Sequence, residues 1–165
     1  MLQVNDYVVF GSTGVCQIAE IVEKSFSGMP AREYYVLRPV YGNNETVYLP
    51  TDHNQEHFRR IHTKEEILAL IQELPDIDSE WVEDDSLRKN MFTEMLHSCE
   101  TRKLAQWIKM IHHRKIELEK RDKKLSGADA DAMKIAEKLL YNELALILEL
   151  EPDQVLPFIL GQIES

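Results

Sequence analysis

Three histidines, His53, His57 and His62, are the first residues whose types and spacing could support chemistry. Imidazole is a common zinc ligand, and a spacing of four residues would place two histidines on one face of a helix. The surrounding residues are typical of a loop, however, and no nearby cysteine completes a metal site. We therefore keep a metal-dependent enzyme only as a remote alternative, and we expect no metal and no cofactor.

The turn-like run from Gly11 to Gly14 could cradle a phosphate, but a phosphate loop needs Gly-Lys-Ser/Thr leading into a helix. An apolar, strand-like segment follows here, which predicts a tight turn. Two carboxylate groups, Glu83-Asp84-Asp85 and the pair Asp129 and Asp131, could serve general acid–base chemistry. Both lie at predicted helix starts, where the helix dipole stabilises negative charge. We find no catalytic arrangement and expect neither an enzyme nor a small-molecule substrate.

The two tryptophans have different surroundings. Trp107 falls within an apolar helical stripe, which predicts a core residue. Trp81 lies between an acidic connector and the start of a helix, outside any clear apolar stripe. Two interpretations stay open for Trp81: it packs into a groove between helices, or it is an exposed aromatic wedge for a nucleic-acid base or a partner.

The net charge of −10 is concentrated in the second part of the chain, because residues 1–62 contribute −2 and residues 63–165 contribute −8. An acidic protein is repelled by nucleic acid at long range, so any DNA contact needs a local basic patch. Residues 102–124 provide one, with nine Lys or Arg against three Asp or Glu. Its last part, 120–124, is either a solvated loop or a phosphate-contacting segment.

Only two cysteines occur, Cys16 and Cys99, which are too few for a disulfide framework. They predict two reduced thiols in a cytoplasmic protein, with a bridge between them as the minor alternative. No stretch approaches the roughly 18 consecutive apolar residues of a transmembrane helix, so we expect no membrane segment.

Strand signals fill residues 1–61, and no helical pattern separates them, which excludes a parallel α/β fold. Short β-forming runs alternate with turn residues, notably at 27–30 and 42–44. We therefore predict an α+β protein whose first domain, residues 1–62, is a small antiparallel β-barrel or sheet. The predicted strands are Tyr7–Phe10, Val15–Phe26, Glu33–Arg38, Glu45–Leu49 and a short Phe58–Ile61.

Helical periodicity fills the rest of the chain, which predicts an all-α bundle as a second domain over residues 63–165. Thr63 and Glu66 form a capping-box pattern at its start. The predicted helices span about 63–74, 84–97, 100–120, 126–149 and from about 152 onward. The third is amphipathic, and its outer face is predicted to be basic, with Arg102, Lys103, Lys109 and Lys120.

Residues in both parts resemble a known family. They are Val4, Asp6, Val8–Phe10, Gly14, Val15, Ile21, Gly28, Tyr34–Leu37 and Val47–Pro50, and, among the helices, Lys124–Ser126 and Ala136–Ala145. Together they resemble the CarD/CdnL family of bacterial transcription regulators. The β-rich part is also similar to the polymerase-interacting domain of transcription-repair coupling factor.

The resemblance implies that a Tudor-like N-terminal module binds the β subunit of RNA polymerase, by pairing a strand edge with the polymerase lobe. The residues implied in this contact are Lys24, Ser25, Phe26 and Tyr48. It also implies that the helical domain stabilises the open promoter complex, where a tryptophan wedges into the minor groove beside basic residues. The residues implied in DNA binding are Trp81, Arg88, Lys89, Lys123 and Lys124.

The helical part departs from the family pattern. An ungapped comparison places Asp85 at the wedge position, with Trp81 four residues earlier, and Ala130 replaces a basic residue. Glu83 and Asp84 add negative charge that repels DNA. A protein-only adaptor, which joins RNA polymerase to another partner without DNA contact, is therefore the alternative function.

Overall fold

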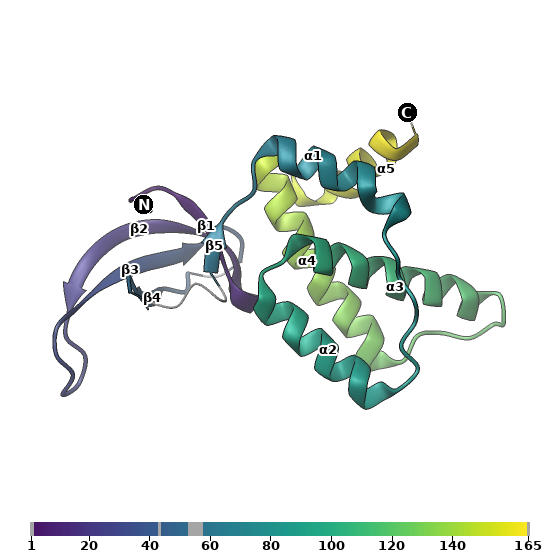
Figure 1. Ribbon diagram of the computed structural model, residues 1–165, viewed down its shortest axis with the longest axis horizontal. Coiled ribbons are helices and arrows are strands. Elements are labelled where there is room, and N and C mark those ends of the chain that lie inside the picture. Colours follow the sequence, from purple (N-terminus) through teal and green to yellow (C-terminus); the bar gives the residue numbers. More distant parts are fainter. Residues whose placement is uncertain (1, 43, 53–57, 165) are drawn as a thin grey trace.

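The computed structural model describes residues 2–42, 44–52 and 58–164. The molecule is elongated, with the strands at one end and the α-helices at the other (Figure 1). We call residues 2–62 the N-terminal module and residues 63–164 the helical module; that they are separate domains stays a prediction. Within the described ranges, no helix is long and apolar enough to cross a lipid bilayer.

Five strands form one antiparallel sheet in the order β4-β3-β2-β1-β5. The sheet is open, with β4 and β5 at its edges, so the predicted α+β class is confirmed with a sheet and not a closed barrel. The predicted tight turn joins β1 to β2, and Gly14 follows it with a φ of 87°, which glycine adopts without strain. The strands are β1 (Tyr7–Phe10), β2 (Gly14–Lys24), β3 (Arg32–Pro39), β4 (Val47–Pro50) and β5 (Phe58–Arg60).

Strand β2 has 11 residues and β1 has four, so β2 extends beyond its partner. β1 pairs with β2 up to Gln17, and the register with β3 then shifts between Ile18 and Glu20. Beyond this β-bulge, β2 and β3 continue as a long antiparallel pair, the β2–β3 ribbon, as far as Lys24, and β4 pairs with the other side of β3 as far as Tyr34 (Figure 1). No described strand pairs with the other side of β2 in this segment, residues 20–24, which we call the free β2 edge.

The N-terminal module has its own apolar core. Tyr35 of β3 stacks on Phe58 of β5, with ring centres 5.9 Å apart. Burial raises the pKa of the Cys16 thiol to about 12 and also raises the pKa of Cys99. Both are free thiols, as predicted. The core side chains are Val8, Cys16, Ile18, Tyr35, Leu37, Leu49 and Phe58.

Five α-helices follow in the described part of the chain, and side-chain caps mark the starts of the first and the fourth. The Thr63 hydroxyl accepts from the backbone of Glu66, whose carboxylate accepts from the backbone of Thr63, so the capping box is confirmed. These hydrogen bonds lower the pKa of the Glu66 carboxyl. Ser126 caps the fourth helix through the backbone N–H of Asp129. The helices are α1 (Lys64–Glu73), α2 (Asp85–Ser98), α3 (Thr101–Glu119), α4 (Gly127–Leu148) and α5 (Val155–Glu164).

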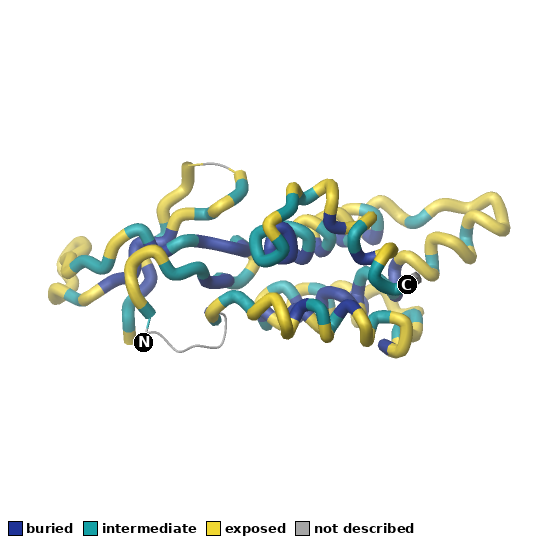
Figure 2. The backbone as a smooth tube through the Cα atoms, turned by 90° about the horizontal axis from the view of Figure 1, so that it is seen from above, coloured by how far each residue is buried: buried dark blue, intermediate teal, exposed yellow. Residues whose placement is uncertain are grey.

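The helices bury their apolar faces against one another, with exposed positions facing outward (Figure 2). Trp107 of α3 is 6% exposed and stacks on Phe92 of α2, with ring centres 5.3 Å apart. Its predicted place in the core is confirmed. Ala136, Ile111 and Leu144, which are at most 1% exposed, lie in the same cluster.

The basic outer face predicted for α3 is only partly correct. Lys109 folds over the end of the first helical segment, where its Nζ donates to the carbonyls of Leu74, Pro75 and Ile77 at 2.8, 2.9 and 2.8 Å. Lysine satisfies carbonyl groups at a helix end in this way. Arg102 also pairs with Glu73 of α1, so two of the four predicted cations tie α3 to the first helical segment, whereas Lys103 pairs with Glu100 beside its own helix.

Candidate functional site

Aromatic side chains gather at the outer end of the β2–β3 ribbon. The ring centre of Phe26 lies 5.2 Å from that of Tyr34 and 5.4 Å from that of Tyr48, both edge-on. Phe26 and Tyr48 are 37% and 38% exposed, whereas Tyr34 is buried. The pair of exposed rings is therefore supported by a third ring that belongs to the sheet.

Lys24, the last residue of β2, completes this cluster. Its Nζ lies 4.7 Å from the ring centre of Tyr48 and 5.4 Å from that of Phe26, which is a cation–π arrangement. The ammonium also donates a hydrogen bond to the Tyr48 hydroxyl at 3.4 Å. We call Lys24, Phe26, Tyr34 and Tyr48 the aromatic surface.

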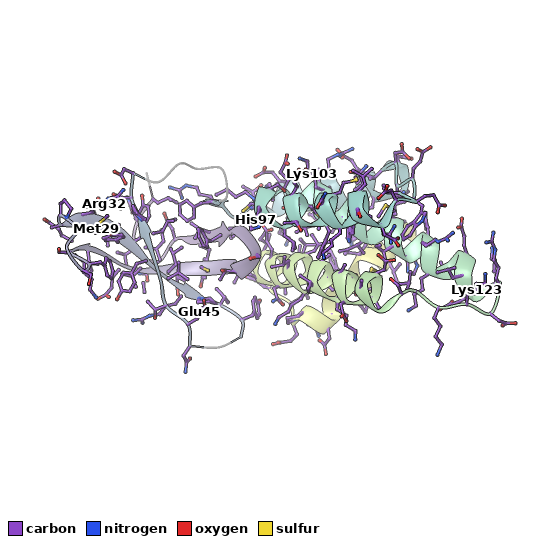
Figure 3. All side chains as sticks on the ribbon, turned by 90° about the horizontal axis from the view of Figure 1, so that it is seen from below. Met29, Arg32, Glu45, His97, Lys103 and Lys123 are labelled. Atoms are coloured by element: carbon purple, nitrogen blue, oxygen red, sulfur yellow. The ribbon has the colours of Figure 1, made fainter. Side chains whose placement is uncertain are left out.

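The turn after β2 holds Phe26 in place. The Ser25 hydroxyl donates to the carbonyl of Met29 at 2.6 Å, and the backbone N–H of Met29 donates to the carbonyl of Phe26 at 2.7 Å. Gly28 has a φ of 72°, which closes the turn without side-chain strain. Met29 and Arg32 lie together at this far end of the molecule (Figure 3).

The aromatic surface adjoins the free β2 edge. Successive residues of a strand direct their N–H and C=O groups to opposite sides, so this edge presents backbone groups that no described strand uses. An extended segment of a partner can add to such an edge as a further strand. Lys24 belongs both to this edge and to the aromatic surface, so the exposed rings offer apolar contact area near those backbone groups.

The four residues predicted for polymerase contact lie together at this place: Lys24, Ser25, Phe26 and Tyr48. Their role stays a prediction, but their proximity is a feature of the fold. Sequence reasoning missed Tyr34 as a member. The alternation of side chains along β3 is the signal that separates Tyr34, in the aromatic surface, from Tyr35, which stacks on Phe58 in the core.

The aromatic surface and the free β2 edge lie in a part of the chain that matches a known protein family. Residues 2–62 match the family model of the CarD-like/TRCF RID domain. The match covers the N-terminal module alone. The resemblance seen in the sequence is thus confirmed for the N-terminal module, which we now call the RID module. RID stands for RNA polymerase-interacting domain, so the match supports a polymerase-interacting role. A search among curated proteins found no significant match.

Outside the RID module, Trp81 is held between two guanidinium groups. The guanidinium carbon of Arg88 lies 4.4 Å from its ring centre, and that of Arg114 lies 5.1 Å from it. The ring is half-buried and packs against the helical core. This is the geometry of the packed interpretation; the wedge role of Trp81 stays a prediction.

Arg88 is buried, although the sequence suggested a basic surface residue. Its guanidinium donates to both carboxylate oxygens of Asp129 at 2.9 and 3.1 Å, to Asp85 at 2.6 Å and to the carbonyl of Val82 at 2.7 Å. Burial alone would lower the pKa of Arg88, but the two carboxylates raise it above its ordinary value. These hydrogen bonds occupy the guanidinium of Arg88, a residue that was predicted to contact DNA.

The three lysines predicted for DNA contact are exposed, but they do not form one site. Lys89 lies on α2, whereas Lys123 and Lys124 lie in the loop between α3 and α4. This loop is at the opposite end of the molecule from Met29 and Arg32 (Figure 3). Lys123 and Lys124 are thus at the other end of the molecule from the turn that follows β2 (Figure 3).

The structure provides no support for the metal-binding alternative in the part of the chain that it describes. His53 and His57 lie outside the described residues. The Nδ1 of His62 is 3.3 Å from the Glu66 carboxylate at the start of α1. Within residues 2–42, 44–52 and 58–164, no group of three potential ligands is placed to hold a metal ion.

Proposed function

We propose that the chain is a non-catalytic transcription regulator whose RID module binds the β subunit of RNA polymerase. The observation that supports this best is the free β2 edge beside the aromatic surface, within the segment that matches the RID family. A strand of the polymerase lobe pairs with this edge, and its side chains pack on Phe26 and Tyr48. Affinity comes from the backbone hydrogen bonds, and the rings select the partner.

Phe26→Asp should weaken binding to an isolated β lobe at least about 30-fold, because a carboxylate replaces an aromatic anchor at the centre of the contact. Pull-down followed by titration with the purified lobe measures the effect. Val40→Asp is a matched control, since Val40 is also 37% exposed on the same module but lies after the other end of β3. Equal affinities of wild type and Phe26→Asp would contradict the proposed docking, and a wild type that does not bind would exclude it.

We propose further that the helical module modulates the lifetime of the promoter open complex. The DNA-contacting groups in this proposal are Lys123 and Lys124, since both are exposed in a loop, whereas Arg88 is occupied by carboxylates. Lysines at a loop tip reach phosphate without rearranging the core. Trp81 then stabilises the entry to α2 and does not act on DNA.

Lys123→Glu combined with Lys124→Glu should reduce the salt dependence of complex formation by about two units in the log–log slope, one for each lost phosphate contact. The double variant should also have a smaller effect than wild type on the lifetime of open complexes. Trp81→Ala serves as the comparison, since the wedge interpretation predicts the larger loss for that variant. Footprinting at the upstream edge of the promoter bubble and a lifetime assay decide between contact through the two lysines and a wedge role of Trp81.

The protein-only adaptor is the second candidate function. It is favoured by the −8 charge of residues 63–165 and by the bonds that already occupy Arg88. If neither the lysine pair nor Trp81 affects the footprint and the lifetime, while the β lobe is still bound, the helical module recruits another protein instead of touching DNA.

A further inference from the structure

An ion pair between a half-buried arginine and a buried glutamate joins the two modules. Arg59 of β5 forms a bidentate, two-armed contact with Glu143 of α4: Nη1 donates to Oε2 and Nη2 donates to Oε1, each at 2.9 Å. Glu143 is 2% exposed. A two-armed contact of this kind fixes the relative orientation of two planar groups as well as their distance.

Arg59 also donates to the carbonyl of Arg60 in its own module at 3.0 Å, and its other donors reach the helical module. Its Nε donates to the carbonyl of Cys99 at 2.5 Å, and Nη2 donates to the Thr101 hydroxyl at 2.8 Å. The Thr101 hydroxyl in turn donates to Glu143 at 3.3 Å. One arginine of the RID module therefore contacts the residue after α2, the start of α3 and α4 at the same time.

The other contacts at this junction are mostly apolar, and they include Tyr41, which packs against the helical core, and Gly14, which lies against Leu139. Val9 and Val15 of the sheet form a small apolar cluster with Cys99, and the backbone N–H of Gly11 donates to the Cys99 sulfur at 3.1 Å. Apolar contacts tolerate rotation better than a two-armed ion pair does. The angle between the modules therefore depends on the contacts of Arg59.

We propose that Arg59 and Glu143 are positioning residues that hold the helical module at one orientation to the RID module. The proposal rests on the proposed function, since the orientation matters only if both ends of the molecule make contacts. The aromatic surface and the loop with Lys123 lie at opposite ends (Figure 3), so a small rotation at the junction moves the loop far from its target. The pair thus sets where the helices lie once the RID module is docked.

The direct test measures orientation without polymerase. Spin labels on Met29→Cys and Lys123→Cys report the end-to-end distance, and the native thiols are buried. Wild type should give one narrow distance distribution. Arg59→Gln combined with Glu143→Gln removes both charges together and should give a distribution at least about twice as wide, because several orientations become populated.

Two further variants separate positioning from general damage. Arg59→Lys keeps a cation beside Glu143 but loses the planar fork, so it should stay folded and still broaden the distribution. Arg60→Gln is the control, because Arg60 is the neighbouring arginine and forms an ion pair with Asp6 of its own module. Its distribution should equal that of wild type.

A functional readout completes the test. The unlabelled double glutamine variant should bind the β lobe within about twofold of wild type, because the aromatic surface is unchanged, and yet lose the effect on open-complex lifetime. Unchanged distance distributions in both Arg59 variants would overturn the proposal, as would a broadened distribution with an undiminished lifetime effect. A wild type that fails to bind the lobe would instead refute the proposed function and leave the distance result standing.

Discussion

Arg88→Met should lower the free energy of unfolding by about 3–5 kcal/mol, which is the cost of removing one partner from a buried ion pair. The variant leaves Asp129, which is 9% exposed, with a carboxylate that has lost both bonds to the guanidinium. It also removes the cation that stacks on one face of Trp81. Urea denaturation followed by circular dichroism measures the change.

Lys89→Met is the matched control for this prediction. Lys89 is the next residue of α2 but is exposed, so its replacement should change the stability by no more than about 0.5 kcal/mol. If the two variants are equally stable, then Arg88 does not serve a structural role. The prediction that Arg88 contacts DNA would then be favoured again.

Arg59→Met should cost a similar amount, about 3–5 kcal/mol, because Glu143 is then left as an unpaired carboxylate inside the protein. Glu143 has little access to water, and its remaining described hydrogen bonds, from Thr101 and from the backbone N–H of His62, are long, at 3.3 and 3.5 Å. Unfolding by urea, monitored for both modules, measures the loss. Arg60→Met should change stability far less, since Arg60 is exposed.

Arg59→Met combined with Glu143→Met provides the internal check. Replacing a buried ion pair by apolar side chains of similar size is often neutral, so the double variant should recover most of the stability that the single variant loses. A double variant as unstable as Arg59→Met would mean that lost packing, and not a stranded charge, explains the effect.

Local patterns were sufficient to predict most of the fold. β1 has the predicted bounds, and α2 and α3 begin and end within one residue of expectation. These elements follow from signals within a few residues of each other, namely alternation, helical periodicity and caps such as Thr63 with Glu66. The free β2 edge was harder to predict from the sequence, since it depends on how far β1 extends along β2.

Charged residues were harder to place, because their partners are distant in the sequence. Arg88 and Asp129 are 41 positions apart, and Arg59 and Glu143 are 84 apart. Nothing near Arg88 in the sequence distinguishes a surface cation from one that two carboxylates hold inside. Lys109 was misplaced for the same reason. The aromatic surface was found through a family resemblance, and Tyr34 was added only by the strand register.

The β-bulge and the short β1 have a consequence for how this protein behaves among copies of itself. An edge with unpaired backbone groups can pair with the same edge of another chain, which is a route to aggregation. Exposed Glu20 and Glu23 lie on this segment, and charged side chains on an edge strand disfavour its pairing with other copies. The charges on the free β2 edge therefore favour solubility while no partner strand is bound to it.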